Sequence, residues 1–175
     1  MIKVYKDNSI YVGEMNSQQR DGIGTLYLLD DFFAGYKVSS DWQDDKLNGY
    51  ATISTKTYTE SGLFVNGIQT GCFSRIYNNG KCSSIRYNNG INESEEVFAH
   101  NGNTNRMFGC IQLSESQYYV GDIYNGNPFG YGMFYDIDVE NNIVSKTFGK
   151  IYGRSLVQWI ELTNNVYEDE NTSAK

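Results

Sequence analysis

Short runs in which apolar and polar residues alternate follow one another along most of this chain. Tyr, Phe, Val, Ile and Thr dominate the runs, and these residue types suit a pleated, half-buried strand. Many runs are separated by an Asn-Gly pair, with the asparagine at positions 48, 66, 79, 89, 101 and 125. Because both residues tolerate positive φ, the pair favours the tight type I′ turn of a β-hairpin. The pattern therefore predicts a series of antiparallel hairpins.

Two distant segments share one sequence pattern. The first runs from Tyr11 to Tyr27 and the second from Tyr119 to Tyr135. Each reads Tyr-x-Gly-acid-apolar, then a polar turn, then Gly-x-Gly and a strand rich in apolar and aromatic residues. Weaker copies span residues 38–53 and 60–73, and short Tyr-Asn-Asn-Gly segments occur at 77–80 and 87–90. Such self-similarity indicates a repeat architecture.

The Tyr-x-Gly-acid-apolar pattern with Gly-x-Gly downstream resembles the MORN repeat, the membrane occupation and recognition nexus motif. Met15 and Ile123 stand where that family usually has tryptophan. The Tyr-Asn-Asn-Gly segments resemble the shorter MORN variant of bacterial proteins often labelled antitoxins. The resemblance covers most of residues 5–152. It implies a protein that acts through contacts with other proteins and sometimes pairs end to end.

These patterns predict an all-β fold, an elongated single-layer sheet of consecutive antiparallel hairpins. Glycines within the strands would let aromatic rings lie against bare backbone. Residues 1–167 are expected to form one domain, followed by a polar, acidic tail over 168–175. Ser155 and Gln158 have capping-box spacing, and Leu156, Trp159 and Ile160 fall on one helical face. The C-terminal segment is therefore expected to be a short capping helix or a final strand that covers the last sheet edge.

Charge and cysteine content narrow the possible partners and compartments. The formal net charge is −7 and the sequence pI is about 4.7, which disfavours generic binding to nucleic acid or anionic lipid. The N-terminal residues lack the apolar core of a signal peptide, and no run of roughly 18 apolar residues predicts a membrane span. Three cysteines without a Cys-x-x-Cys pair favour reduced thiols. A cytoplasmic protein is expected.

Catalytic chemistry is not indicated by the sequence. His100 is the single histidine and stands beside an Asn-Gly pair, where an exposed turn residue is expected. The chain carries no nucleophile elbow, phosphate loop or paired metal-ligand motif. Its acidic pairs lack the alternating spacing of a calcium loop. We therefore expect a non-enzymatic protein with no catalytic residues, no cofactor and no metal.

The function expected first is that of a protein-binding module or scaffold. An aromatic-lined groove on the repeat sheet would hold a segment of a partner protein. The residues assigned to this groove are Tyr11, Trp42, Phe64, Tyr119 and Tyr131. Most tyrosines of the chain are expected to be packing residues instead.

Two alternatives use charged surfaces. An antitoxin or immunity-type inhibitor would present acidic residues to the basic active site of a toxin or defence enzyme, from Glu93–Glu96 and from Asp30, Asp31, Asp41, Asp44 and Asp45. A peripheral lipid-associated protein would bind anions through Arg75, Lys81 and Arg86, which lie in a stretch without acidic residues from Ser61 to Asn92. The other interpretation is that these scattered cations only balance the acidic first third of the chain. Self-association is a further possibility.

Overall fold

The computed structural model describes residues 1–29, 36–100, 106–138, 140, 143–152 and 155–161. All regular elements in these ranges are strands, which confirms the predicted all-β fold. In chain order they are β1 (Ile2–Val4), β2 (Ile10–Asn16), β3 (Gln19–Leu28), β4 (Tyr36–Gln43), β5 (Lys46–Ser54), β6 (Tyr58–Val65), β7 (Ile68–Tyr77), β8 (Lys81–Asn88), β9 (Ile91–His100), β10 (Arg106–Gln112), β11 (Gln117–Tyr124), β12 (Asn127–Asp138), β13 (Ile143–Tyr152) and β14 (Ser155–Glu161).

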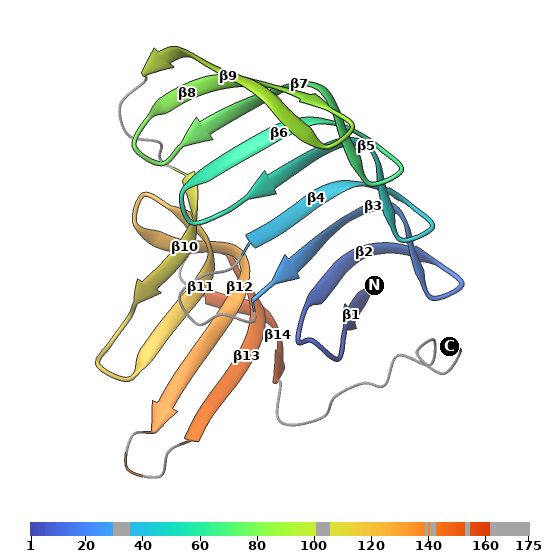
Figure 1. Ribbon diagram of the computed structural model, residues 1–175. Coiled ribbons are helices and arrows are strands. Elements are labelled where there is room, and N and C mark those ends of the chain that lie inside the picture. The colour runs from blue at the N-terminus through green and yellow to red at the C-terminus, as the bar shows by residue number, and fades with distance from the viewer. Residues whose placement is uncertain (30–35, 101–105, 139, 141–142, 153–154, 162–175) are drawn as a thin grey trace.

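The strands form two open antiparallel sheets in strict chain order (Figure 1). Strands β1–β9 make a nine-stranded sheet, and β10–β14 make a five-stranded sheet. The predicted row of consecutive hairpins is confirmed, and the structure adds a division between β9 and β10. The C-terminal segment, for which helix and strand were both open, is strand β14, paired with β13. The acidic tail over 168–175 lies outside the described residues.

Tight turns join successive strands, and three of the six Asn-Gly pairs lie at the centre of such a turn. At Asn79-Gly80 only the glycine has positive φ. Both central residues have positive φ at Ser17-Gln18, Asp44-Asp45, Asn66-Gly67, Asn89-Gly90 and Asn125-Gly126. This is the requirement of a type I′ turn, whose twist matches that of the flanking strands. The Asn-Gly pair at 48 was wrongly expected to mark a turn, because it lies inside β5. The pair at 101 lies outside the described residues.

The Gly-x-Gly element and the preceding acid have a common backbone role. The first glycine, Gly22, has a φ of 87°, and the pairing of β2 with β3 shifts between Gly13 and Met15. A residue in this left-handed conformation is typical of a β-bulge. The carboxylate of Glu14 accepts a hydrogen bond from the backbone N–H of Ile23 at 3.0 Å. The acid of the repeat therefore supports the bulge beside it.

The second glycine of Gly-x-Gly leaves space for an aromatic ring. A Cβ atom on Gly24 would lie 2.2 Å from Cζ of Tyr11, and one on Gly132 would lie 2.4 Å from Cε2 of Tyr119. Both rings therefore lie against the bare backbone of the neighbouring strand. This arrangement agrees with the predicted pairing of aromatic rings with strand glycines.

The two faces of the nine-stranded sheet are buried in different ways. We call the face that carries Tyr11, Trp42, Phe64 and Phe73 the inner face. Its two hydrophobic clusters are built only from this sheet and its connections, so its bent strands pack their own side chains against one another. In the described part of the chain, no residue of β10–β14 belongs to these two clusters.

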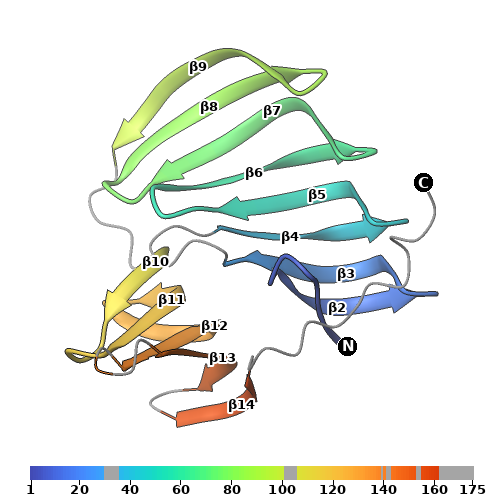
Figure 2. The same cartoon turned by 60° about the horizontal axis from the view of Figure 1, so that its bottom comes forward.

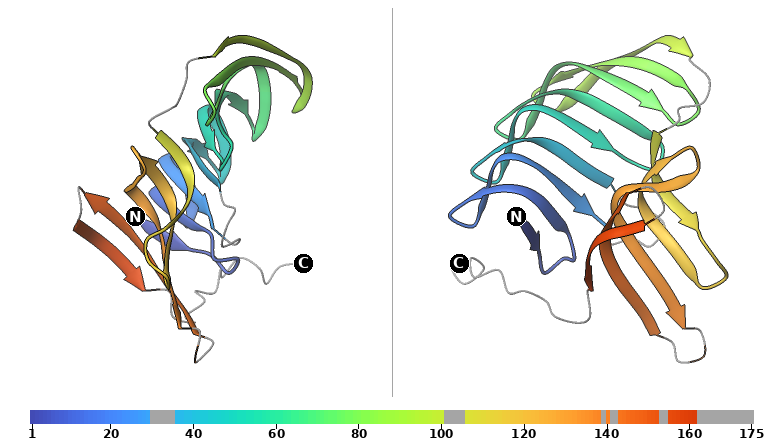
Figure 3. Two further views of the ribbon diagram at one scale, coloured as in Figure 1. Left: turned by 90° about the vertical axis from the view of Figure 1, so that its left-hand side faces the viewer. Right: turned by 180° about the vertical axis from the view of Figure 1, so that it is seen from behind.

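The five-stranded sheet packs against the opposite, outer face at β1–β4 (Figures 2 and 3). Ile10 and Tyr27 contribute to one hydrophobic cluster with Phe108 and Phe148, and the Tyr27 and Phe148 rings are 5.2 Å apart. The Tyr135 hydroxyl donates a hydrogen bond to the Leu29 carbonyl at 3.0 Å. The second sheet also reaches Ser54 and Thr59 at the adjoining ends of β5 and β6, and the outer face of β5–β9 beyond these residues lies outside this packing. Among the described residues, no helix is long and apolar enough to cross a membrane.

Candidate functional site

The repeat copy at residues 60–73 differs from the clear copies, in which a tyrosine ring lies against the glycines of the strands. Counting back two residues from the first strand glycine gives Tyr11 and Tyr119 in the clear repeats, but Glu60 before Gly62. The covering ring comes from the opposite strand, since a Cβ atom on Gly62 would lie 2.4 Å from Cγ of Phe73. Because Phe73 fills this space, position 60 is free to carry a carboxylate.

The Glu60 carboxylate lies in the core of the inner face, and only 2% of the residue is exposed. Glu60 is directly opposite Arg75 in the pairing of β6 with β7. Its Oε2 atom accepts a hydrogen bond from Nε of Arg75 at 2.7 Å, and its Oε1 atom accepts one from Gln69 at 2.8 Å. The Tyr87 hydroxyl donates a further bond to Oε2 at 3.4 Å. A buried carboxylate requires this degree of compensation.

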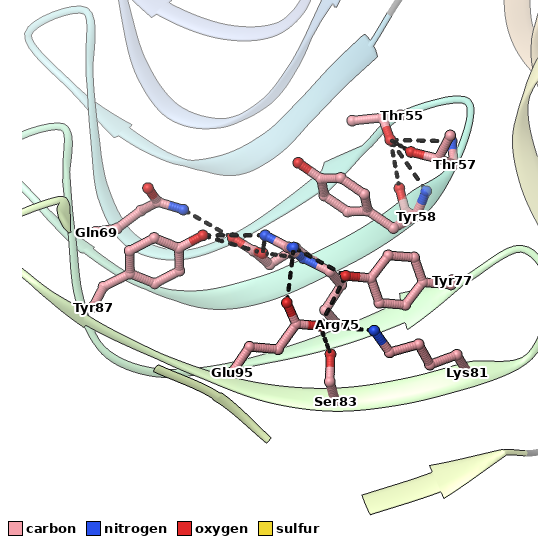
Figure 4. Close-up of polar contacts among 11 residues, drawn as sticks. Thr55, Thr57, Tyr58, Gln69, Arg75, Tyr77, Lys81, Ser83, Tyr87 and Glu95 are labelled. Carbon is pink, nitrogen blue, oxygen red and sulfur yellow. Dashed lines mark hydrogen bonds and ion pairs between the residues drawn. The ribbon is translucent and has the colours of Figure 1, made fainter. Parts of the chain in front are cut away.

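The Arg75 guanidinium links Glu60 to the last two strands of the sheet (Figure 4). It donates to the Tyr77 hydroxyl at 3.2 Å and lies 4.2 Å from the ring centroid of Tyr58. Burial disfavours its charged form, but the hydrogen bonds to Tyr77 and Glu60 and the charge of Glu60 outweigh this and raise the pKa of Arg75. We call the whole group the Arg75 network: Tyr58, Glu60, Gln69, Arg75, Tyr77, Lys81, Ser83, Tyr87 and Glu95.

Glu95 connects strand β9 to the Arg75 network. Its Oε1 atom accepts hydrogen bonds from the Ser83 hydroxyl at 2.7 Å and the Tyr77 hydroxyl at 2.8 Å. Lys81 donates to the same atom at 3.3 Å. The Ser83 bond, followed by the Tyr77 bond and the Lys81 contact, lowers the pKa of Glu95 to about 2. The network therefore fixes the last strand of the sheet through an ionised carboxylate.

The lowered pKa predicts an acid-dependent contribution to stability. A depressed folded-state pKa contributes stability that is fully present above the unfolded pKa of roughly 4.3 and is lost as pH falls through about 2. We expect Glu95→Gln to lower the unfolding free energy at pH 6, and the difference from the wild type to shrink toward pH 2. Urea unfolding of both proteins across this range checks it. A difference that is independent of pH would contradict the assigned contacts.

Four of the five aromatic residues assigned to a partner groove are buried in the chain itself. Tyr11, Trp42, Phe64 and Tyr119 are each at most 6% exposed. Trp42 donates from Nε1 to the Gly24 carbonyl at 3.0 Å, and burial raises the pKa of Tyr11 to about 12. This placement corrects the expected open groove, because a thin curved sheet uses these rings as its core. Tyr11 and Tyr119 instead fit the expectation that most tyrosines of the chain are packing residues.

Tyr131, the fifth of these residues, lies between the two sheets. Its ring stacks on Phe148 with centroids 5.6 Å apart and planes 8° apart, and it lies 6.1 Å from the ring of Tyr27. Tyr131 therefore joins the sheets rather than facing a groove.

The predicted acidic surface is divided among several local roles. Asp44 and Asp45 are the two turn residues between β4 and β5, and Asp45 bonds Nε of Arg20 at 3.0 Å. Asp41 is exposed, and its side chain lies beside Gly49, where an added Cβ atom would be 3.3 Å from Cβ of Asp41. Asp30 and Asp31 lie outside the described residues. Of this set, Asp41 and Asp44 are therefore the clearly exposed carboxylates.

The three predicted anion-binding cations do not form a positive strip. Arg75 and Lys81 are ion-paired with Glu60 and Glu95, which stand just outside the acid-free stretch of sequence. Arg86 pairs with Cys72 and is exposed on the outer face. Strand pairing brings distant acids beside these cations, so the local sequence composition gave the wrong impression of free positive charge.

Other reactive side chains do not gather into a site within the described ranges. No group of three or more His, Cys, Asp or Glu residues there could hold a metal ion. Cys72 is exposed, Cys82 is buried and Cys110 is half-buried, and all three are free thiols. His100 ends strand β9, and its side chain lies outside the described part of the structure.

The outer face carries exposed apolar side chains that the sequence interpretation missed. Strand pairing places Tyr50 opposite Leu63 and Val65 opposite Ile68. Ile68 lies next to the β8–β9 turn, where Ile91 begins β9. We call these five the outer stripe: Tyr50, Leu63, Val65, Ile68 and Ile91. A signal was present, because the unbroken apolar run from Leu63 to Val65 must place apolar groups on both faces of a strand.

Comparisons with known proteins leave the family open. No protein-family model matches this chain, and no curated protein matches it.

Proposed function

We propose that the protein is a non-enzymatic binding module that holds an apolar segment of another protein on its outer stripe. The observation that carries this proposal is the exposure of contiguous apolar side chains, with Tyr50 at 74% and Ile91 at 69%. Contiguous exposed apolar surface on a soluble domain is typical of an interaction site. The resemblance to MORN repeats supports the same class of function.

The stripe has the chemistry of an interface centre. Tyrosine is enriched among residues that dominate binding energy, and its ring offers a large contact area. Asp41, Asp44 and Glu93 are exposed in the same half of the sheet, and the chain carries a net charge of −7. The favoured partner therefore presents apolar side chains surrounded by Lys or Arg, because complementary charge accelerates association.

Inhibition of a basic toxin or defence enzyme is a second candidate function. The exposed Asp41 and Asp44 side chains favour it, since both would be available to a positively charged active site. This candidate differs from a scaffold in the chemistry of the partner. Loss of a captured enzyme's activity on addition of this protein would select it.

Ile68 and Ile76 offer a matched test of the outer stripe. Both lie on β7, with 43% and 44% exposure, but Ile76 is at the opposite end of the strand from the stripe. We expect Ile68→Lys to weaken binding of the partner captured by the wild type at least about tenfold, equal to roughly 1.4 kcal/mol. Ile76→Lys should bind normally.

The measurement is affinity capture followed by titration calorimetry with the purified partner. Circular dichroism of both variants controls for folding. Equal weakening by both substitutions, or by neither, would remove the stripe as the binding surface.

A further inference from the structure

Strand β9 forms the open end of the nine-stranded sheet (Figures 1 and 2). It is 10 residues long, and within the described part of the chain it pairs only with β8. Residues 91–97 are all exposed. A long edge strand presents unpaired backbone N–H and C=O groups, which can pair with another strand.

The charges on β9 are of one sign. Glu93, Glu95 and Glu96 lie between Ile91 and Val97, and this segment contains no Lys or Arg. Glu95 is opposite Ile85 of the inner face, whereas Glu96 is opposite Ser84. Successive side chains point to opposite faces of a strand, so Glu96 lies on the outer face and Glu95 on the inner face. The charge of Glu95 is balanced by Lys81, and the negative charge open to a partner is therefore that of Glu93 and Glu96. Two copies of β9 laid edge to edge would repel each other.

The Arg75 network holds this edge in place. Glu95 bonds Ser83 and Lys81 of β8 and Tyr77 of β7, so β9 is tied to two strands by side chains as well as by its backbone ladder. An ordered edge reduces the entropy that strand addition costs. The charge that protects the edge against self-pairing also selects an oppositely charged partner.

We propose that β9 binds an extended, lysine- or arginine-bearing segment of another protein by β-strand addition. The backbone of that segment would supply the tenth strand, and its cations would face Glu93 and Glu96. The inference shares with the proposed function a polypeptide ligand that carries Lys or Arg. It uses the backbone edge of β9, which meets the outer stripe at Ile91, whereas the other four residues of the stripe lie on β5–β7. The two proposals can therefore fail separately.

The probe is a fluorescent ten-residue peptide with two central lysines flanked by alternating valine and threonine. Fluorescence anisotropy with the full chain, up to millimolar protein, should detect binding. Three control peptides test the mode of binding. Two of them carry N-methyl groups on alternate backbone amides, one peptide for each edge of the added strand. The third has glutamates in place of the lysines.

The glutamate peptide and one of the two N-methylated peptides should bind at least tenfold more weakly than the lysine peptide. Glu93→Lys with Glu96→Lys should weaken it similarly, whereas Ile68→Lys should bind the peptide as the wild type does. Peptide binding should also slow hydrogen exchange at backbone amides within residues 91–97.

Absence of binding by the lysine peptide would overturn the proposal. Equal binding by both N-methylated peptides would also overturn it, since the attraction would then be purely electrostatic. Loss of partner capture in Ile68→Lys together with normal peptide binding would establish two separate sites. Normal partner capture by Ile68→Lys, together with binding of the lysine peptide, would overturn the outer stripe as a binding surface and leave the proposal for β9 standing.

Discussion

Glu60→Leu is expected to lower the free energy of unfolding by roughly 3 kcal/mol or more, because it leaves the Arg75 guanidinium without its buried partner. The Arg75 side chain is only 14% exposed, so water cannot replace the carboxylate fully. Gln69 and Tyr87 also lose their acceptor. Chemical denaturation monitored by circular dichroism measures the loss.

The matched control removes both charges. Glu60→Leu combined with Arg75→Met should recover most of the lost stability, since a buried ion pair can often be replaced by apolar groups at little cost. Val38 and Ile53 already form such an apolar pair on the inner face, in the same row as Glu60. A double variant as unstable as Glu60→Leu would show that the network contributes more than charge compensation.

Gly24→Ala is expected to cost about 3 kcal/mol, although it adds a single methyl group. The new Cβ atom would lie 2.0 Å from the Tyr11 hydroxyl oxygen and 2.2 Å from Cζ, so the ring must leave its place on the backbone. Tyr11 is buried and packs edge-on against Trp42 at 5.8 Å, which leaves the ring little room. The melting temperature and the urea midpoint should both fall.

Two controls separate the clash from a general effect of alanine. Gly109→Ala should be tolerated, because its Cβ atom would meet the nearest heavy atom at 3.7 Å. Tyr11→Val should lower the free energy of unfolding less in the Gly24→Ala background than in the wild type. The repeat copy at residues 38–53 already combines Val38, at the position equivalent to Tyr11, with Ala51, at the position equivalent to Gly24. Strict additivity of the two substitutions would contradict the proposed contact.

Much of the fold could be predicted because its determinants are local. The turn at Asn66-Gly67 and the glycines that receive the Tyr11 and Tyr119 rings depend on residues close in sequence. The division after β9 could not be predicted in this way. It depends on Ile10 and Tyr27 packing against Phe108 and Phe148, which are far away in the chain.

The candidate site was harder to predict from the sequence, because it also depends on contacts between strands. Aromatic residues that look suitable for binding, such as Trp42 and Phe64, are what a thin sheet needs for its core. The charge of Arg75 could be interpreted only after strand pairing placed Glu60 beside it. Alternation alone assigns residues to opposite faces, but it does not say which face is covered. The outer stripe was missed for that reason.

The packing of the second sheet on β1–β4 also fixes the order in which the molecule can be completed during synthesis. The hairpins of β1–β9 pair with chain neighbours and can form as they emerge, but Ile10 and Tyr27 receive their cover only when Phe148 has been made. At 5–20 residues per second, synthesis of the intervening 120 or so residues takes roughly 6–24 s. During that interval the earliest strands present apolar surface to the cell. Strands β2 and β3 therefore receive their apolar cover only after a much later part of the chain has been made.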